Sequence, residues 1–550
     1  MGQGCAGLRE YEMTDIELYI VLIAIIAVVG VVFRNSVIPT SLLLVMVGMA
    51  ISFIPDFPTF NLNPKFIFDV FLPLLLYEAS SYSTTWNEIR LSLRPIILLS
   101  IGHVIFITTL IAITIHYLIP DFGWPLAFVL GAVISPPDDV AIISIAEKVK
   151  MPNRVITILK GEAMFNDATA LIIYRFALIA AITHQFSFID SIAEFFMIVI
   201  CETAYGYVLA TIIGNIRLLL RDSSLQMIIS ILTPFLAYLP ATRLGGSGVV
   251  ATVATGLFIA NNYWEKYPAD VRLTARSIWS TLGFGVQSIL FLMVGLNLKD
   301  VIINNDYIAA IDLLKLSGAV VFVVIVGRFL WCYPSAYIPR WLFASIRKRE
   351  PNLPWQYPFV ISWAGMRGGI SLAAALAVPE HTLVDGIHPR ELLVFLVFTV
   401  IIATLLIQGL SLPWLLKIIG MPQFGKLEDE QEQKSELMTR SAMSAAVLKW
   451  LSEFALQVKD DEALMAEIKL KIKEYSMIED HLRDRMEAKE KMQLQSEEVR
   501  IQEKKLLLAQ IIQVERSELS RCFRQGEVSH HTKYKLEQQL DLLAKHFEDI

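Results

Sequence analysis

Charged residues are scarce in this chain of 550 residues: Asp, Glu, Lys and Arg make up 18% of it, against 55% hydrophobic residues. Soluble globular proteins carry about 25% charged residues, so the composition excludes an ordinary soluble domain. Cysteine is equally scarce, and the four cysteines show neither metal-ligand spacing nor a disulfide framework. We expect Cys5, Cys201, Cys332 and Cys522 to be packing residues.

The N-terminus lacks the basic region, short apolar stretch and small-residue cleavage site of a removable signal peptide. Apolar runs of bilayer-spanning length, in contrast, are abundant from Ile16 to Ile419. The sequence therefore predicts an all-α polytopic membrane protein. We predict thirteen spanning segments, at 16–33, 37–54, 64–81, 95–118, 124–147, 155–183, 190–220, 224–240, 247–263, 274–297, 308–335, 355–380 and 391–419.

Basic residues crowd alternate connections between these segments, which predicts the orientation by the positive-inside rule. The connections rich in basic residues carry Arg34; Arg90 and Arg94; Lys148, Lys150 and Arg154; Arg217 and Arg221; Lys266 and Arg272; Arg340, Arg347, Lys348 and Arg349. The other side carries only Arg9, Lys65, Arg243, Lys299 and Arg390. We therefore expect residues 1–15 outside the cell, the C-terminus in the cytoplasm, and a multi-pass protein of the plasma membrane.

The composition changes abruptly after Gly420, where KLEDEQEQK opens a tail rich in Glu, Lys, Gln and Leu. We predict a linker at 420–434 and a cytoplasmic helical regulatory region at 435–550. Apolar residues recur there at helical spacing, but the heptads slip too often for a coiled coil, which favours packed amphipathic helices. The tail has no nucleotide-, metal- or phosphate-binding motif. We expect it to bind a regulatory partner, and we expect no nucleic acid.

Proline and aspartate interrupt one of the apolar segments, in the run SPPDDVA. Pro136 and Pro137 remove two backbone donors and disfavour helical geometry just before Asp138 and Asp139. A helix broken at mid-membrane is tolerated only where its backbone is buried in protein or lines a water-filled cavity. A simple proline kink is the alternative. Two adjacent acids weigh against it, because each charge near a membrane centre costs at least ~2.5 kcal/mol.

A second polar cluster lies in the apolar run KGEAMFNDATALIIYRF. Glu162 and Asn166 are four residues apart and share a helix face, while Asp167 is turned by about 100° from Asn166. We expect one acid to face a water-accessible cavity and the other to face a fixed partner. Structural ion pairs for both acids are the alternative.

Two arginines in later segments are candidate partners for such an acid. Arg367 is flanked by Gly365, Gly368 and Gly369, which permit local unwinding, and Arg328 lies in VVIVGRFLWC. A broken helix in each half of the chain is typical of an inverted-repeat transporter with its site at the midplane. Glu78 lies near the end of the third segment, where a role in the site and a position at the membrane interface are equally open alternatives. His103 and His116 are expected to be hydrogen-bonded packing residues.

Three motifs in this order, SPPDDVA, GEAMFNDATALIIYR and GMRGGISLAAALAVP, resemble those of the monovalent cation/proton antiporter family. The branch they resemble is that of NhaP-type bacterial sodium/proton exchangers, which are related to animal sodium/proton exchangers. The resemblance covers roughly residues 16–419. It implies a core domain that moves against a dimerisation domain, and a homodimer in membrane lipid. It also implies a transporter rather than an enzyme, with no cofactor.

The resemblance assigns roles residue by residue. Asp167 matches the acid that alternately binds a cation and a proton, Asn166 matches the asparagine before it, and Asp138 matches the acid at the first helix break. Glu162 matches the acid that pairs with the arginine at Arg367, and Arg328 matches a second, supporting arginine. The cation and proton set is completed, from less specific matches, by Pro137 and Glu78, with Asp139 in support.

Two departures from the family pattern touch the expected ion shell. Ala163 stands where relatives often have serine, and Pro137-Asp138-Asp139 stands where many have Thr-Asp-Pro. They leave the cation open: Na⁺ is favoured, with Li⁺ or K⁺ as alternatives and K⁺/H⁺ antiport as a rival activity. Asn166 is neutral where some relatives have a second aspartate, so the resemblance favours electroneutral exchange. A cation channel is disfavoured because no filter-like loop is visible, and a sensor signalling through the tail is a further alternative.

Overall fold

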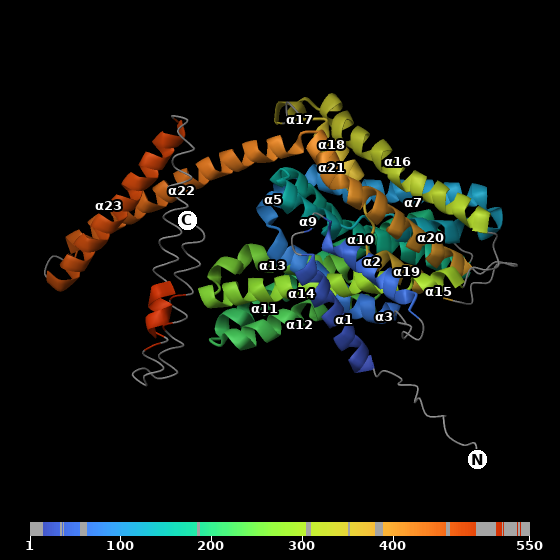
Figure 1. Cartoon of the computed structure of the whole chain (residues 1–550), viewed down its shortest axis with the longest axis horizontal. Coiled ribbons are helices and arrows are strands. Elements are labelled where there is room, and N and C mark those ends of the chain that lie inside the picture. Colours follow the sequence, from blue (N-terminus) through green and yellow to red (C-terminus); the bar gives the residue numbers. More distant parts are fainter. Residues whose placement is uncertain are drawn as a thin grey trace, which may run out of the picture. The chain divides into compact units, whose positions relative to one another are not determined.

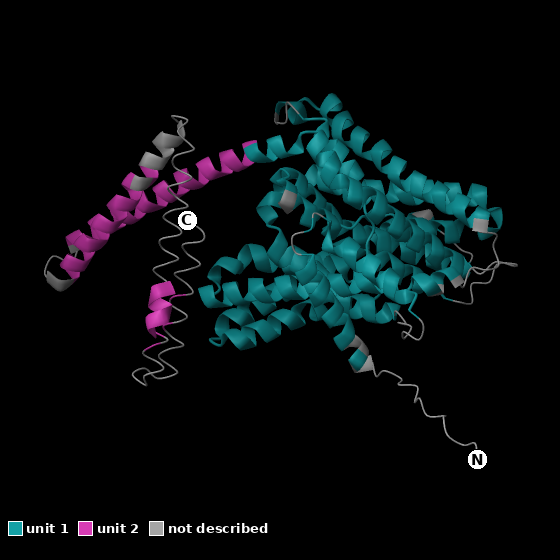
Figure 2. Ribbon diagram, viewed as in Figure 1, with its two compact units in different colours: residues 1–426 teal, residues 427–550 magenta. Residues whose placement is uncertain are grey.

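The computed structural model describes residues 15–33, 36, 38–54, 63–183, 187–303, 310–349, 353–379, 389–457, 462–490 and 513–519, and residues 521, 536 and 540. These residues form helices and connecting turns, with no strand among them. The chain divides into two compact units, residues 1–426 and 427–550 (Figure 2). The expectations for residues 1–14, Arg34 and Cys522 lie outside the described residues.

Each predicted spanning segment is occupied by helix in the structure (Figure 1). The first half contains α1 Asp15–Val32, α2 Thr40–Ser52, α3 Pro64–Phe66, η1 Ile67–Phe71, α4 Leu72–Glu78, η2 Ala79–Ser83, α5 Trp86–Leu91, α6 Leu93–Ile97, η3 Leu98–His103, α7 Val104–Leu118, η4 Pro120–Phe122, α8 Trp124–Ile134, α9 Val140–Val149, α10 Asn153–Thr183 and α11 Phe188–Leu219. The second half contains α12 Ser223–Arg243, α13 Val249–Asn262, η5 Trp264–Lys266, α14 Ala269–Leu296, α15 Leu298–Ile303, α16 Ala310–Leu342, α17 Ala344–Arg349, α18 Gln356–Trp363, α19 Gly369–Leu376, α20 Pro389–Thr404, η6 Leu405–Gly409 and α21 Leu410–Ile418.

Seven helical stretches among the described residues are both long and apolar enough to cross a membrane. Four further apolar helices have 10 to 17 residues, and α8 and α18 are halves of interrupted segments. The structure is therefore that of a multi-pass, all-helical membrane protein. The count of thirteen crossings stays a prediction.

Two groups of helices divide the first unit. In the core bundle, which we define as α7 to α10, α16 and α18 to α20, α7 packs on α8 and α16, and α19 packs on α20. In the panel, defined as α4 with α11 to α14, α13 packs on α4, α11 and α12. Figure 1 shows α11, α12 and α13 gathered together, apart from α7, α16 and α20. The resemblance implies a moving and a fixed domain, and these groups are the candidates.

A close backbone approach joins α2 to α14. At Gly295 a Cβ atom would overlap the Val45 carbonyl oxygen, and at Gly48 it would overlap the Leu292 carbonyl oxygen. Small residues let membrane helices pack at this distance, where dispersion contacts replace a hydrophobic driving force. The two glycines therefore fix how α2 lies on α14.

This crossing gives a stability prediction with a matched control. We expect Gly295→Ala to destabilise the protein by about 1–3 kcal/mol through overpacking. We expect Gly285→Ala, on the same helix with no atom within 4 Å of the added Cβ, to be neutral or mildly stabilising. Thermal denaturation of the purified proteins in one detergent measures both. A melting temperature lowered equally by the two changes would contradict the packing argument.

The tail begins as one long helix. α22 Met421–Gln457 runs through most of the segment that we expected to be a linker, 420–434, and α23 Glu462–Glu490 follows. Glu436 and Arg440 pair on its surface, and Trp450 stacks on Phe454. The division into linker and regulatory region stays a prediction. Of the described cysteines, Cys332 is buried as expected, whereas Cys201 is exposed on α11, so its expected packing role is wrong.

Candidate ion-binding site

Two interrupted helices meet at their breaks. α8 ends at Ile134 and α9 begins at Val140, while α18 ends at Trp363 and α19 begins at Gly369. The Asp138 N–H donates to the Met366 carbonyl oxygen across 2.7 Å, so the two non-helical segments lie directly against each other. Both breaks fall where the prolines and glycines predicted them. Through this bond, each break supplies a hydrogen-bond partner to a backbone group that the other break leaves unpaired.

Asn166 ties α10 to this crossing. Its Nδ2 donates to the Pro137 carbonyl oxygen at 2.9 Å, which replaces a hydrogen bond that the broken helix lacks. The side chain is fully buried, and its Oδ1 accepts no hydrogen bond from any described residue. A buried acceptor left open costs free energy unless water or an ion occupies it. Asn166 therefore has one structural contact and one unused oxygen beside the break.

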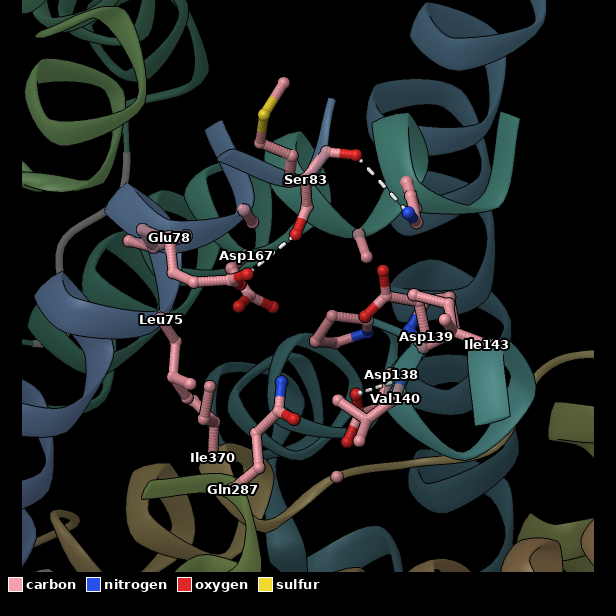
Figure 3. Close-up of a pocket in the computed structure, with 18 of the residues that line it drawn as sticks. Leu75, Glu78, Ser83, Asp138, Asp139, Val140, Ile143, Asp167, Gln287 and Ile370 are labelled. Atoms are coloured by element: carbon pink, nitrogen blue, oxygen red, sulfur yellow. Dashed lines mark hydrogen bonds between the residues drawn. The ribbon is translucent and has the colours of Figure 1, made fainter. Parts of the chain in front are cut away.

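Four carboxyl groups line a single cavity of about 120 Å³ next to the crossing (Figure 3). Glu78 comes from α4, Asp138 and Asp139 come from the first break, and Asp167 comes from α10. The cavity has room for several water molecules. The structure thus brings together the acids that the sequence singled out, with Glu78 among the residues that line the cavity. Ala163 lines the same cavity, at the expected ion shell.

Two of these four carboxylates have hydrogen-bond donors among the described residues. Asp138 accepts from the Val140 N–H at 3.1 Å and Glu78 accepts from the Ser83 hydroxyl at 2.7 Å, whereas Asp167, like Asp139, accepts none from the residues that the structure describes. Asp167 also borders a second, smaller void of about 20 Å³, lined by Leu171, Tyr174 and others. The residue therefore lines both the larger cavity and this small void.

Glu162 pairs with a different arginine from the one that we predicted. Arg328 forms a bidentate ion pair with Glu162: Nη1 donates to Oε1 at 2.7 Å and Nη2 donates to Oε2 at 2.8 Å. Both side chains are 1% exposed. Arg367 donates instead to the Gly365 carbonyl oxygen at 2.9 Å, and its Nε and Nη2 have no partner among the described residues. The predicted Glu162–Arg367 pair is therefore wrong in its partner.

The helix break explains the difference. The last carbonyls of α18, and those in the break that follows it, have no intrahelical donors, and each arginine donates to one of them. Arg367, on the break itself, reaches its own segment at Gly365, while Arg328 on α16 reaches Ile361 with Nε at 2.9 Å and leaves its fork for Glu162. Spacing along one chain does not reveal which arginine faces α10.

His103 and His116 lie away from the cavity lining, and neither carries an assigned role. His103 is fully buried with its Nδ1 4.0 Å from Glu162 Oε1, and neither ring nitrogen has a hydrogen-bond partner among the described residues. His116 stacks on Trp124 with ring centroids 4.2 Å apart. Both are packing residues as expected. The expected hydrogen bonds are missing at His103 and at Nδ1 of His116.

Lys160 and Ser83 are among the cavity's polar lining residues that the sequence did not single out. Lys160 was recognisable, because it precedes Ala163 by three residues and Asp167 by seven and so shares their helix face. Ser83 was not. It reaches Glu78, five residues earlier, because η2 is a π-helix and brings residues i and i+5 together.

Gly368 gives a prediction that tests the crossing itself. A Cβ atom at this position would overlap the carboxylate of Asp138, although the backbone, at φ −105°, accepts any residue. We expect Gly368→Ala to push Asp138 out of place and to lower cation-dependent proton movement about tenfold or more, since small misplacements are costly at such sites. Gly318→Ala, with no neighbour within 4 Å, is the control. Equal activity in the two variants would show that Asp138 need not hold this position.

Crossed, interrupted helices with carboxyl groups at the break define a secondary transporter of the polytopic, all-helical class. Comparison with known proteins then identifies the family. The model of the sodium/hydrogen exchanger transmembrane domain matches residues 20–418. The chain belongs to this sodium/hydrogen exchanger family of monovalent cation/proton antiporters.

Relatives with curated names agree. The chain is 33% identical over 421 residues to the sodium, potassium, lithium and rubidium/H⁺ antiporter of Bacillus subtilis, a match covering 72% of this chain and 61% of that protein. It is 29% identical over 550 residues to the uncharacterized Na⁺/H⁺ exchanger YjcE of Escherichia coli, covering 95% and 97%. The match thus spans about three fifths of the Bacillus relative and nearly the whole of the other.

A solved structure shares the fold. The sodium proton antiporter MjNhaP1 from Methanocaldococcus jannaschii superposes with a TM-score of 0.59 at 17% identity, covering 74% of this chain and 98% of that one. At this identity the likeness concerns the arrangement of helices alone.

Proposed function

We propose that the protein exchanges a monovalent cation for a proton across the plasma membrane, with Asp167 as the group that binds both. One observation carries the proposal: the Asp167 carboxylate faces a cavity lined by three other acids and has no fixed partner among the described residues. A carboxylate held by an arginine, like Glu162, is unavailable to a transported ion. Asp167 is available.

Competition at one carboxylate makes exchange obligatory. A bare carboxylate is costly to move through low dielectric, so the group moves only with a proton or a cation bound. The cavity draws its lining from the core bundle, with Asp138, Asp139 and Asp167, and from the panel, with Glu78. Motion of one group against the other would expose Asp167 alternately to the two sides of the membrane. Such rocking of one bundle around a fixed site is the general scheme of alternating access.

The neutral Asn166 supports a one-for-one stoichiometry. Its amide carries no exchangeable charge, and its Nδ2 is already committed to Pro137, so a single acid changes charge in each half-cycle. Na⁺ is the favoured cation, with Li⁺ and K⁺ as alternatives, in line with the activity for which the Bacillus relative is named. A homodimer, an external N-terminus and a regulatory role for the tail complete the proposal.

Reconstituted liposomes test these statements together. Purified protein is placed in liposomes with an internal pH dye, and Na⁺, Li⁺, K⁺ or choline is added outside over a range of pH. We expect the interior to become alkaline, because each entering cation drives a proton out, and we expect this change to depend on the small cations and to continue when valinomycin and K⁺ clamp the membrane potential at zero. No flux with any cation would contradict exchange and favour the sensor. Flux that cannot run against a cation gradient would indicate a channel.

A further inference from the structure

Lys160 is the one positively charged residue among the described residues that line the cavity, and the exchange mechanism gives it no role. It lies on α10 seven residues before Asp167, about 10 Å along the helix axis. Its Nζ donates to the Ser83 carbonyl oxygen at 3.3 Å, and it forms no ion pair with any carboxylate that the structure describes. Figure 3 draws this hydrogen bond as a dashed line from the labelled Ser83.

The ammonium group is held there by a residue of another helix. Ser83 ends η2, which packs on α13 of the panel, and its hydroxyl donates to Glu78 Oε1 at 2.7 Å. A chain of two hydrogen bonds therefore runs from Lys160 through Ser83 to Glu78. It places a fixed positive charge among four acids without neutralising any one of them by direct contact.

The charge of the cavity follows from its lining. Glu78, Asp138, Asp139 and Asp167 contribute four negative charges when all are ionised, and Lys160 contributes one positive charge, which leaves three negative. The neighbouring lining residues from α14 and α19, Gln287 and Ser371, are neutral. An entering cation is attracted by the acids and repelled by the resident ammonium.

Resting on the proposed exchange at Asp167, we infer that Lys160 sets the affinity of the site: its tethered ammonium weakens binding of the transported monovalent cation. With the axial separation of the two residues, about 10 Å, taken as the distance between the charges, an effective dielectric constant near 20 gives a repulsion that changes a binding constant about tenfold. Lys160 thereby affects how tightly the cation binds, and it does not itself bind or transport the cation.

The test measures the apparent KM for Na⁺ and the maximal rate of exchange separately, in liposomes at alkaline pH, where protons compete least with the cation. We expect Lys160→Met and Lys160→Gln each to lower the KM for Na⁺ about tenfold without raising the maximal rate. Lys160→Arg keeps the charge and should keep the KM within about twofold of the unmodified protein. Lys315→Met, an exposed lysine on α16 that pairs with Asp312 at 3.1 Å, is the matched control.

The outcomes separate this inference from the function on which it rests. An unmodified protein without cation-dependent flux would overturn the exchange proposal itself. Flux in the unmodified protein, with an unchanged or raised KM in either neutral variant, would overturn the role of Lys160. A fall in maximal rate or in protein yield at constant KM would show that the hydrogen bond from Lys160 to Ser83 has only a structural role. That result would also count against a role of Lys160 in cation affinity.

Discussion

Replacing Asp167 by asparagine is expected to reduce cation-dependent proton movement to the level of empty liposomes. The amide is nearly the same size as the carboxylate, but it neither takes up a proton near neutral pH nor supplies the charge that compensates a dehydrated cation. Because Asp167 accepts no hydrogen bond from the described residues, the substitution breaks no fixed contact there. We therefore expect the variant to accumulate in the membrane at the normal level and to melt at the same temperature or higher.

The matched control is Asp312→Asn, the same chemical change at an exposed position on α16. It should exchange at the normal rate. Measurable exchange by Asp167→Asn, in a preparation whose control is fully active, would remove Asp167 from the mechanism and leave Asp138 or Asp139 as the binding acid. Loss of folded protein would instead show that the open geometry around Asp167 hides a structural contact.

Much of this site could be predicted from the chain because unusual residues stand in a membrane segment for a reason. Two prolines before two aspartates, and an arginine among glycines, indicate broken helices without any knowledge of tertiary structure. The structure places both breaks there and joins them through Asp138 and Met366. Helical spacing also predicted that Glu162 and Asp167 point in different directions. In the structure Glu162 pairs with Arg328, and Asp167 lines the cavity.

Pairing across the bundle could not be predicted in the same way. Two arginines were available to Glu162, and the choice depends on how α16 is rotated against α10, which no spacing within one helix encodes. The link from Ser83 to Glu78 depends on a π-helical turn, whose i to i+5 register is invisible in the sequence. The role of Gly295 depends on which helix crosses α14, so it too needed the three-dimensional arrangement.

Replacing Arg328 by methionine is expected to destabilise the protein by about 3–5 kcal/mol, because it leaves the fully buried Glu162 without its only bidentate partner among the described residues. Replacing Arg367 by methionine should cost much less. Its guanidinium makes one hydrogen bond to Gly365 and pairs with no carboxylate in the described part of the chain, so removing it leaves no stranded charge. Thermal unfolding and yield of monodisperse protein in one detergent measure both variants.

A double-mutant cycle distinguishes the pair from its surroundings. If Glu162 and Arg328 stabilise each other directly, Glu162→Gln combined with Arg328→Met should cost clearly less than the sum of the single changes, since the second change removes a group already stranded by the first. The same cycle between Glu162 and Arg367 should be close to additive. Additive costs for the Arg328 cycle, with strong coupling to Arg367, would restore the pairing that the sequence alone suggested. Exchange depends on an intact core bundle. Loss of transport in Arg328→Met together with a low yield of folded protein is therefore attributed to lost stability, and only loss of transport at the normal yield indicates a direct role in exchange.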